Sequence, residues 1–235
     1  MQNRIFLLVT SILSPVAFSA SAQTQASRAV ADHITEAYGG QKLFSLRALR
    51  IIDDALYSEY KYGFTPDFYE YDRSQSDLVV DFETSSGSFD YRVAGDRFAY
   101  HNRNLTTEDG IISVSYALGT FEPNAFESFI DAFGAPMRRS DTVIAYWIGQ
   151  TPGELHVTGT SRYYGREHWV AEFDLPVGRK STLFIDQSSG LITRMDRELW
   201  NGTVLRTVWA DHAISDGITY ASFVQVHYGD HLERV

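Results

Sequence analysis

Residues 165–228 constrain the fold most, because their apolar and polar side chains alternate with a period of two. In the clearest run, Trp169, Ala171, Phe173 and Leu175 alternate with largely polar neighbours, and similar runs follow around residues 191–199, 205–209 and 218–226. Successive side chains of a strand point to opposite faces of a sheet. The pattern therefore predicts an antiparallel sheet with one apolar face and one hydrated face.

Turn residues separate these runs and favour hairpins between them. Asn201-Gly202 is typical of a type I′ turn, in which both central residues adopt positive φ. The segment Asp186-Gln187-Ser188-Ser189-Gly190 predicts a longer hairpin loop, and Asp216-Gly217 predicts a third turn.

Residues 1–22 have the pattern of a secretory signal peptide. Arg4 gives a short positive region, residues 5–17 are largely apolar, and Ala20-Ser21-Ala22 forms a small-residue cleavage site before Gln23. The apolar run is short for a membrane span, and no later stretch approaches the required length. We therefore expect an exported protein, periplasmic or extracellular, whose mature chain has no transmembrane segment.

Composition narrows the classes of partner. The formal net charge of −10, without a basic cluster, argues against nucleic acid and against charge-driven binding to anionic lipid surfaces. The chain contains no Cys, so disulfides, thiolate metal ligands and a lipidated Cys are excluded. Residues 23–235 show no linker or internal repeat and suit a single mainly β domain.

The first half of the chain predicts a helix followed by a β-meander. Apolar residues recur at helical spacing over residues 27–38, and Gly39-Gly40 is expected to end this helix. Strands are expected near residues 49–56, 78–83, 89–93, 97–103 and 111–118. The aromatic-rich segment 57–71 is either a stacking surface for sugar or lipid or a loop pinned by its own rings.

The period then changes and predicts two helices. Residues 123–133 place Phe126, Phe129, Ile130 and Phe133 at i, i+3, i+4 and i+7, with Pro123 in the first turn and Gly134 as the stop. Residues 140–148 predict a second helix, capped by Ser140 or Asp141. Helices set between meanders predict a mainly β (α+β) fold. Its expected architecture is a single curved antiparallel sheet, or incomplete barrel, with helices packed on the concave face.

At three places the chain resembles the outer-membrane lipoprotein-sorting (LolA/LolB-like) family. These are residues 36–43 (EAYGGQKL), the hairpin of residues 182–186 (TLFID) and 190–194 (GLITR), and the turn formed by Asp211-His212, Asp216-Gly217-Ile218 and Ala221-Ser222. The resemblance covers most of residues 23–235. It implies a half-open antiparallel barrel around a helical plug, with an apolar cavity for acyl chains or a similar ligand.

A related version of this half-barrel forms the N-terminal domain of exported metallo-β-lactamase-fold hydrolases. Residues 164–168 (YGREH) and 209–212 (WADH) resemble that version as well. The hydrolase half is absent, and the family's closing strand is not found before Val235. We therefore expect either a truncated product or a barrel left open by one strand.

No catalytic motif, metal site or cofactor site is predicted. His227, Asp230 and His231 are the one histidine cluster, but they lie at the C-terminus and lack the spacing of the hydrolase signature. Glu167-His168 and Asp211-His212 are expected to be residues of the hydrated sheet face. The chain alone is therefore not expected to be an enzyme.

Binding of a hydrophobic ligand has better physical support. An acyl chain gains roughly 0.8 kcal/mol per buried methylene and requires only an apolar concavity. The predicted function is exported, non-enzymatic binding of a lipid or lipoprotein acyl chain; the alternatives are an accessory domain or fragment of an exported hydrolase and a structural module of the cell envelope. Seven aromatic residues are expected to line the cavity or to pack as core: Phe126, Phe129, Phe133, Trp147, Trp169, Phe173 and Trp209.

Export gives the first testable prediction. A signal peptidase should cleave after Ala22, because the preceding small residues fit its site. N-terminal sequencing of protein from the periplasm or medium should begin at Gln23. Recovery of only the uncleaved chain, in the cytoplasm, would contradict this localisation.

Overall fold

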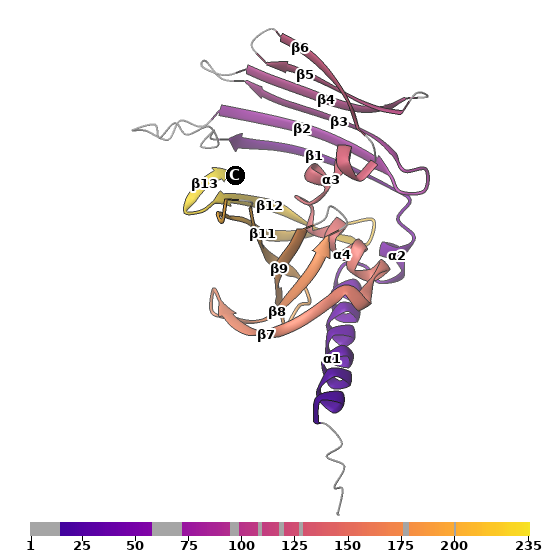
Figure 1. Ribbon diagram of the computed structural model, residues 1–235, viewed down its shortest axis with the longest axis vertical. Coiled ribbons are helices and arrows are strands. Elements are labelled where there is room, and N and C mark those ends of the chain that lie inside the picture. Colours follow the sequence, from indigo (N-terminus) through magenta and orange to yellow (C-terminus); the bar gives the residue numbers. More distant parts are fainter. Residues whose placement is uncertain are drawn as a thin grey trace, which may run out of the picture.

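The computed structural model describes residues 15–57, 72–94, 99–107, 110–117, 120–126, 129–175, 179–199 and 201–235. Within these ranges, thirteen antiparallel strands form one hydrogen-bonded sheet in the order β6-β5-β4-β3-β2-β1-β13-β12-β11-β10-β9-β8-β7. β6 and β7 are the two ends of this order, so the sheet of the described residues is open. The predicted fold class, a mainly β curved sheet with helices, is confirmed (Figure 1).

The first half-sheet is a meander in which each strand pairs with the next in sequence. Leu78, Val80, Phe89 and Val93 are buried on one face, which we call the inner face. Their neighbours in sequence lie on the opposite, outer face, as the period of two requires. The strands are β1 (Ala48–Tyr57), β2 (Asp72–Asp81), β3 (Ser86–Ala94), β4 (Ala99–Thr107), β5 (Gly110–Ala117) and β6 (Thr120–Phe126).

The second half-sheet is also a meander, and its inner face carries most of the core. Ala171, Phe173, Leu183 and Ile185 are buried there, as the alternation predicts. The strands are β7 (Leu155–Tyr163), β8 (Arg166–Leu175), β9 (Arg179–Asp186), β10 (Ile192–Glu198), β11 (Val204–Ser215), β12 (Ile218–Tyr228) and β13 (His231–Arg234).

A very short pairing joins the two half-sheets. β1 and β13 align at Tyr57 and Arg234. Beside this pair, the Leu56 N–H donates to the Val235 carbonyl (2.7 Å) and the Val235 N–H donates to the Leu56 carbonyl (2.9 Å). By contrast, β11 and β12 pair from Leu205–Tyr228 to Ser215–Ile218. We call the β1–β13 contact the junction.

The helices lie on the inner side and connect the half-sheets. α1 (Pro15–Ala37) packs along β7, and the Ser27 hydroxyl accepts a hydrogen bond from the Val157 N–H (3.0 Å). α1 ends before Gly39 and Gly40, both at positive φ, as predicted. The short helices α2 (Gln41–Phe44) and η2 (Pro152–Glu154) flank α4. Figure 1 shows α1 extending away from the strands at its N-terminal end.

α3 (Phe129–Met137) and α4 (Asp141–Gln150) connect β6 to the second half-sheet. α3 packs on β2, β3, β5 and β6, whereas α4 packs on α1, β8 and β12. The Ser140 hydroxyl accepts the Val143 N–H (3.3 Å), so the predicted cap of α4 is confirmed. A Cβ at Gly149 would lie 2.5 Å from the Phe44 ring, so glycine permits the close approach of α2 and α4.

The predicted helix over residues 123–133 is wrong in both boundaries. Pro123 pairs with Val114 inside β6, and α3 begins only at Phe129 and continues through Gly134 to Met137. β6 is an edge strand, where the missing N–H of proline can face away from the ladder. Glycine weakens a helix by only about 1 kcal/mol, so Gly134 does not stop α3.

One predicted turn also differs, and one predicted segment lies outside the described residues. Gly202 has positive φ, and the loop closes where the Leu199 N–H donates to the Thr203 carbonyl (2.8 Å). This is a longer hairpin loop than type I′. The turn predicted at Asp216-Gly217 is present, and both residues have positive φ. The aromatic segment after Tyr57 lies outside the described residues up to position 71.

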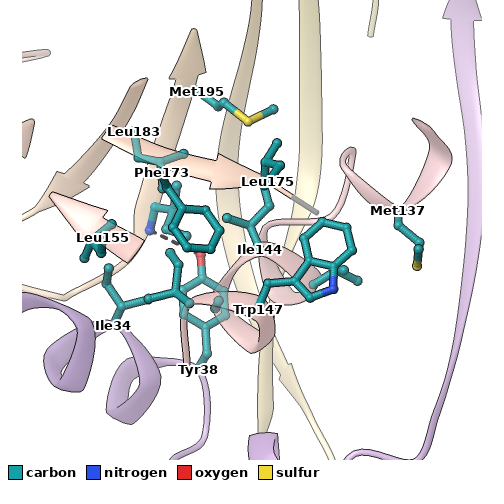
Figure 2. Close-up of a cluster of buried hydrophobic side chains, with 14 of the residues drawn as sticks. Ile34, Tyr38, Met137, Ile144, Trp147, Leu155, Phe173, Leu175, Leu183 and Met195 are labelled. Carbon is teal, nitrogen blue, oxygen red and sulfur yellow. Dashed lines mark hydrogen bonds between the residues drawn. The ribbon is translucent and has the colours of Figure 1, made fainter. Parts of the chain in front are cut away.

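Both half-sheets and the helices share one continuous apolar core. In Figure 2, Trp147 of α4 lies between side chains of the second half-sheet and Met137 of α3. The cluster joins the first half-sheet to α3 through Leu78, Val80 and Phe89. Its other members include Ile34, Tyr38, Phe133, Met137, Ile144, Trp147, Leu155, Phe173, Leu183, Met195 and Trp209.

Candidate functional site

The predicted cavity residues gather in the core between the half-sheets. Phe133, Trp147, Phe173 and Trp209 are buried members of one cluster, and Trp169 packs against its margin. The Trp209 indole N–H donates to the Arg139 carbonyl (2.8 Å), which ties β11 to the turn between α3 and α4. The side chains of Phe126 and Phe129 lie outside the described residues.

Aromatic contacts cross from the helices to the first half-sheet. The rings of Phe82, after β2, and Tyr146, on α4, stack with centroids 4.8 Å apart. The Phe133 ring lies so close to Gly87 of β3 that a Cβ there would be 3.5 Å from it. We call the apolar layer of Phe82, Phe133, Met137, Tyr146, Trp147 and Trp209 the seam.

A polar group beneath the junction accompanies the seam. The Arg234 side chain, 5% exposed, forms an ion pair with Asp53 of β1. It also donates to the Tyr91 hydroxyl (3.5 Å) and lies 5.6 Å from the centroid of that ring. Through this one side chain, β13 contacts both β1 and β3. The inner face under the junction is therefore held by a charged contact rather than by a long ladder.

A buried carboxylate ties the helices to the second half-sheet. Asp141, 2% exposed at the start of α4, accepts the Tyr38 hydroxyl (2.7 Å) and bonds His212 Nε2 (2.9 Å) through the same oxygen. Its other oxygen accepts the N–H groups of Thr142 (2.9 Å) and Ala221 (3.2 Å). We call Tyr38, Asp141 and His212 the polar cluster. Because an ionised carboxylate only accepts, His212 donates through Nε2.

The Tyr38 phenol is held as a neutral donor. Burial, then the charge and hydrogen bond of Asp141, raise the pKa of Tyr38 well above its usual value. Its oxygen also accepts the Ile192 N–H (3.2 Å), which adds β10 to the polar cluster. Every group is engaged in holding another, so the arrangement fits a structural role and not a nucleophile with its base.

His212 reaches Asp141 because of an irregularity in β11. Asp211 has φ 51°, a left-handed conformation inside a strand, and the aligned pairs pass from Ala210–Phe223 to His212–Ala221. Thr207 and Trp209 are buried at the expected spacing of two, but the next inward side chain is His212 rather than Asp211. The expectation that His212 lies on the hydrated face was therefore wrong.

His168 was also expected on the hydrated face and is 1% exposed. It lies on the outer side of β8 opposite Asp186, with the Tyr163 ring 5.7 Å from its own. Its Nδ1 bonds the Arg166 carbonyl (3.0 Å). Burial tends to raise the pKa of Asp186, but hydrogen bonds from Ser188, Ser189 and Arg166 lower it to about 2. These contacts fix the hairpin loop predicted at residues 186–190.

The C-terminal histidines lie on neighbouring, paired strands. His227 lies on β12 and His231 is buried on β13, so the cluster is part of the sheet rather than a frayed end. Burial, assisted by Arg206, lowers the pKa of His227, and burial beside His227 lowers that of His231. Within the described ranges, no group of three His, Asp or Glu side chains is placed to hold a metal ion.

The polar cluster gives a prediction about stability. Replacing Asp141 with alanine leaves the Tyr38 hydroxyl, His212 and the Ala221 N–H without their acceptor in the interior. We expect a loss of about 3–5 kcal/mol of unfolding free energy, measured by urea denaturation. Asp174→Ala, at an exposed position of β8, is the control and should change the free energy by less than about 0.5 kcal/mol. Equal losses of unfolding free energy in both variants would show that the polar cluster stabilises the fold no more than an exposed carboxylate does.

Comparison with solved structures places the fold. A DUF1329 family protein from Desulfovibrio piger matches with a TM-score of 0.51 and 11% identity, covering 91% of this chain and 91% of that one. The LolA superfamily protein NE2245 from Nitrosomonas europaea matches with a TM-score of 0.47 and 10% identity over 91% of each chain. No protein-family model and no curated protein matches the sequence.

The link to metallo-β-lactamase-fold hydrolases has no support among these structures. Among the described residues, none of the helices combines the length and apolarity of a membrane span. The chain shares its fold with the DUF1329 family protein.

Proposed function

We propose that this protein is exported and binds a hydrophobic ligand, a lipid or lipoprotein acyl chain, without chemical conversion. The ligand lies in the seam, between α3, α4 and the two half-sheets. The observation that supports this most is the combination of an extensive apolar layer with a junction of minimal length. The same proposal assigns the buried aromatic residues, above all Phe133, Trp147 and Trp209, to the walls of the ligand site.

The energetics favour an opening at the junction. Separating β1 from β13 breaks the Leu56–Val235 hydrogen bonds and the Arg234 contacts, whereas the ladders within each half-sheet stay intact. Net contributions are about 1 kcal/mol for a neutral hydrogen bond and somewhat more for a charged one. An acyl chain of ten methylenes gains about 8 kcal/mol on burial, before ordering costs. Before ordering costs, the gain therefore exceeds the loss of these junction contacts.

The seam suits a long apolar chain better than a compact polar substrate. Its members are aromatic rings and a flexible methionine, Met137, which can repack around ligands of different shape. No precise polar constellation is needed for such recognition. Arg234, Asp53 and Tyr91 lie under the junction and would become accessible as it parts.

A reversible disulfide across the junction, which would lock β1 to β13, tests the proposal. The reciprocal Leu56–Val235 bonds mark a directly paired position, where Cα atoms lie about 5.5 Å apart and a disulfide fits. In the variant Leu56→Cys/Val235→Cys, which has no other thiol, oxidation should weaken binding of a dansyl-labelled fatty acid by at least about tenfold. Reduction should restore binding, measured by energy transfer from tryptophan to the dansyl group.

A wall substitution completes the experiment. Trp147→Ala should weaken probe binding by about tenfold or more, whereas Tyr164→Ala, which removes a ring that is 84% exposed, should not. If the wild-type protein shows no saturable probe binding, the protein is a structural module of the envelope instead. Equal binding by the oxidised and reduced locked variant would remove the junction as the entrance.

A further inference from the structure

A hollow lies on the outer face of the first half-sheet, opposite the seam. It is a groove of about 590 Å³ across β1, β2, β3 and β4. Such a volume is typical of small-molecule sites. Its lining is unlike the seam, because it is dominated by Arg and Asp side chains with one exposed apolar residue, Ile52, which is 70% exposed.

Paired charges organise the groove. Arg50 donates to Asp77 through Nε (3.0 Å) and Nη2 (2.6 Å), and Arg92 Nε donates to Asp90 (2.8 Å). These two-pronged contacts hold each guanidinium in a defined plane and leave the Nη1 amino groups outside them. The hydrogen bond from Arg50 lowers the pKa of Asp77. Burial tends to raise the pKa of Asp90, but the hydrogen bonds and charges of Arg92 and His101 together lower it. Both acids are therefore ionised acceptors near neutral pH.

Arg103 has no such partner. It lies on β4 directly across from Asp90, but Asp90 is already engaged by Arg92 and by His101 (3.1 Å). Among the described residues, the exposed Arg103 side chain has no hydrogen-bond or ion-pair partner. The groove therefore presents one guanidinium whose charge is not compensated locally. An anionic group is the natural complement of that side chain.

The register places these groups in a row. Ile52 aligns with Asp77, Asp77 with Asp90, and Asp90 with Arg103, all on the outer face. Neighbouring strands are about 4.8 Å apart, so the row spans about 14 Å from Ile52 to Arg103. Along it an apolar surface is followed by two hydrogen-bond acceptors and then by a cation. This order determines what a ligand must carry.

We propose that the groove binds an acidic saccharide, a sugar that carries one carboxylate or phosphate group. Its anionic group binds Arg103, its hydroxyl groups donate to Asp77 and Asp90, and its C–H face rests on Ile52. Sugar hydroxyls both donate and accept, so they can also accept from the free Nη1 groups of Arg50 and Arg92. A bare anion would use only Arg103 and leave the remaining acceptor capacity of both acids unused, and a neutral sugar would leave Arg103 unpaired. The site is independent of the proposed acyl-chain site.

Matched probes test the proposal directly. D-glucuronate, glucose 6-phosphate, glucose and inorganic phosphate are titrated into the ¹⁵N-labelled protein, and amide shifts are followed by NMR. We expect saturable shifts in β1–β4 for at least one acidic sugar, with affinity about tenfold or more above that of glucose and of phosphate. Comparing D-glucuronate with glucose 6-phosphate shows whether the anionic group of the ligand is a carboxylate or a phosphate. Raising the salt concentration should weaken binding, because Arg103 is exposed.

Two variants separate the site from general charge effects. Arg103→Gln should lower the affinity for the acidic sugar to that for glucose. Arg162→Gln, at an exposed and equally unpaired arginine of β7, should leave it unchanged. Thermal melts establish that both variants are folded. The proposal is overturned if acidic sugars give no saturable shifts, if phosphate alone binds as tightly, or if Arg103→Gln has no effect.

Discussion

Asp141 is the group on which the arrangement of helices and sheet depends. Its carboxylate accepts hydrogen bonds from Tyr38, after the end of α1, and from the Thr142 N–H at the start of α4. It also bonds His212 of β11 and accepts the Ala221 N–H of β12. Each element presents an apolar surface that could slide, because dispersion and burial are not directional. A buried carboxylate with four donors fixes one arrangement, since any shift leaves donors unpaired in the interior. The position of α4, and with it Trp147, follows from this contact.

Among the described residues, the first half-sheet has no buried carboxylate of this kind to tie it to the second. It is joined by the junction, by Arg234 and by apolar packing under α3 and α4. The molecule therefore combines a second half-sheet that is tied to its helices with a first half-sheet that is held largely by the seam. Weakly held elements are where binding motions are generally found. The acyl-chain proposal uses this difference, because the ligand replaces seam contacts while the polar cluster keeps its bonds.

The sequence predicted the elements whose signals are local, and it failed where distant contacts decide. Alternation identified the second half-sheet because each strand has one buried face, and Ser140 marked the start of α4. Phe126, Phe129 and Phe133 fit a helical period although β6 ends at Phe126, because a short spacing pattern cannot exclude a strand followed by a helix.

The polar cluster was missed because its members lie 103 and 71 positions apart. His212 faces inward only through the φ of Asp211, which no alternation predicts. Periodicity marked the seam aromatics as buried, but the short junction above them depends on the pairing of distant strands.

Hydrogen exchange at the junction tests the central claim, that the half-sheets part at β1 and β13 to take up an apolar chain. The Leu56 amide, which donates to Val235, reports on this pairing, and the amides between β11 and β12 report on the anchored half-sheet. With a saturating fatty acid, the account predicts faster exchange at Leu56 and unchanged exchange between β11 and β12. An unchanged or slower Leu56 amide, with the ligand bound, would contradict it.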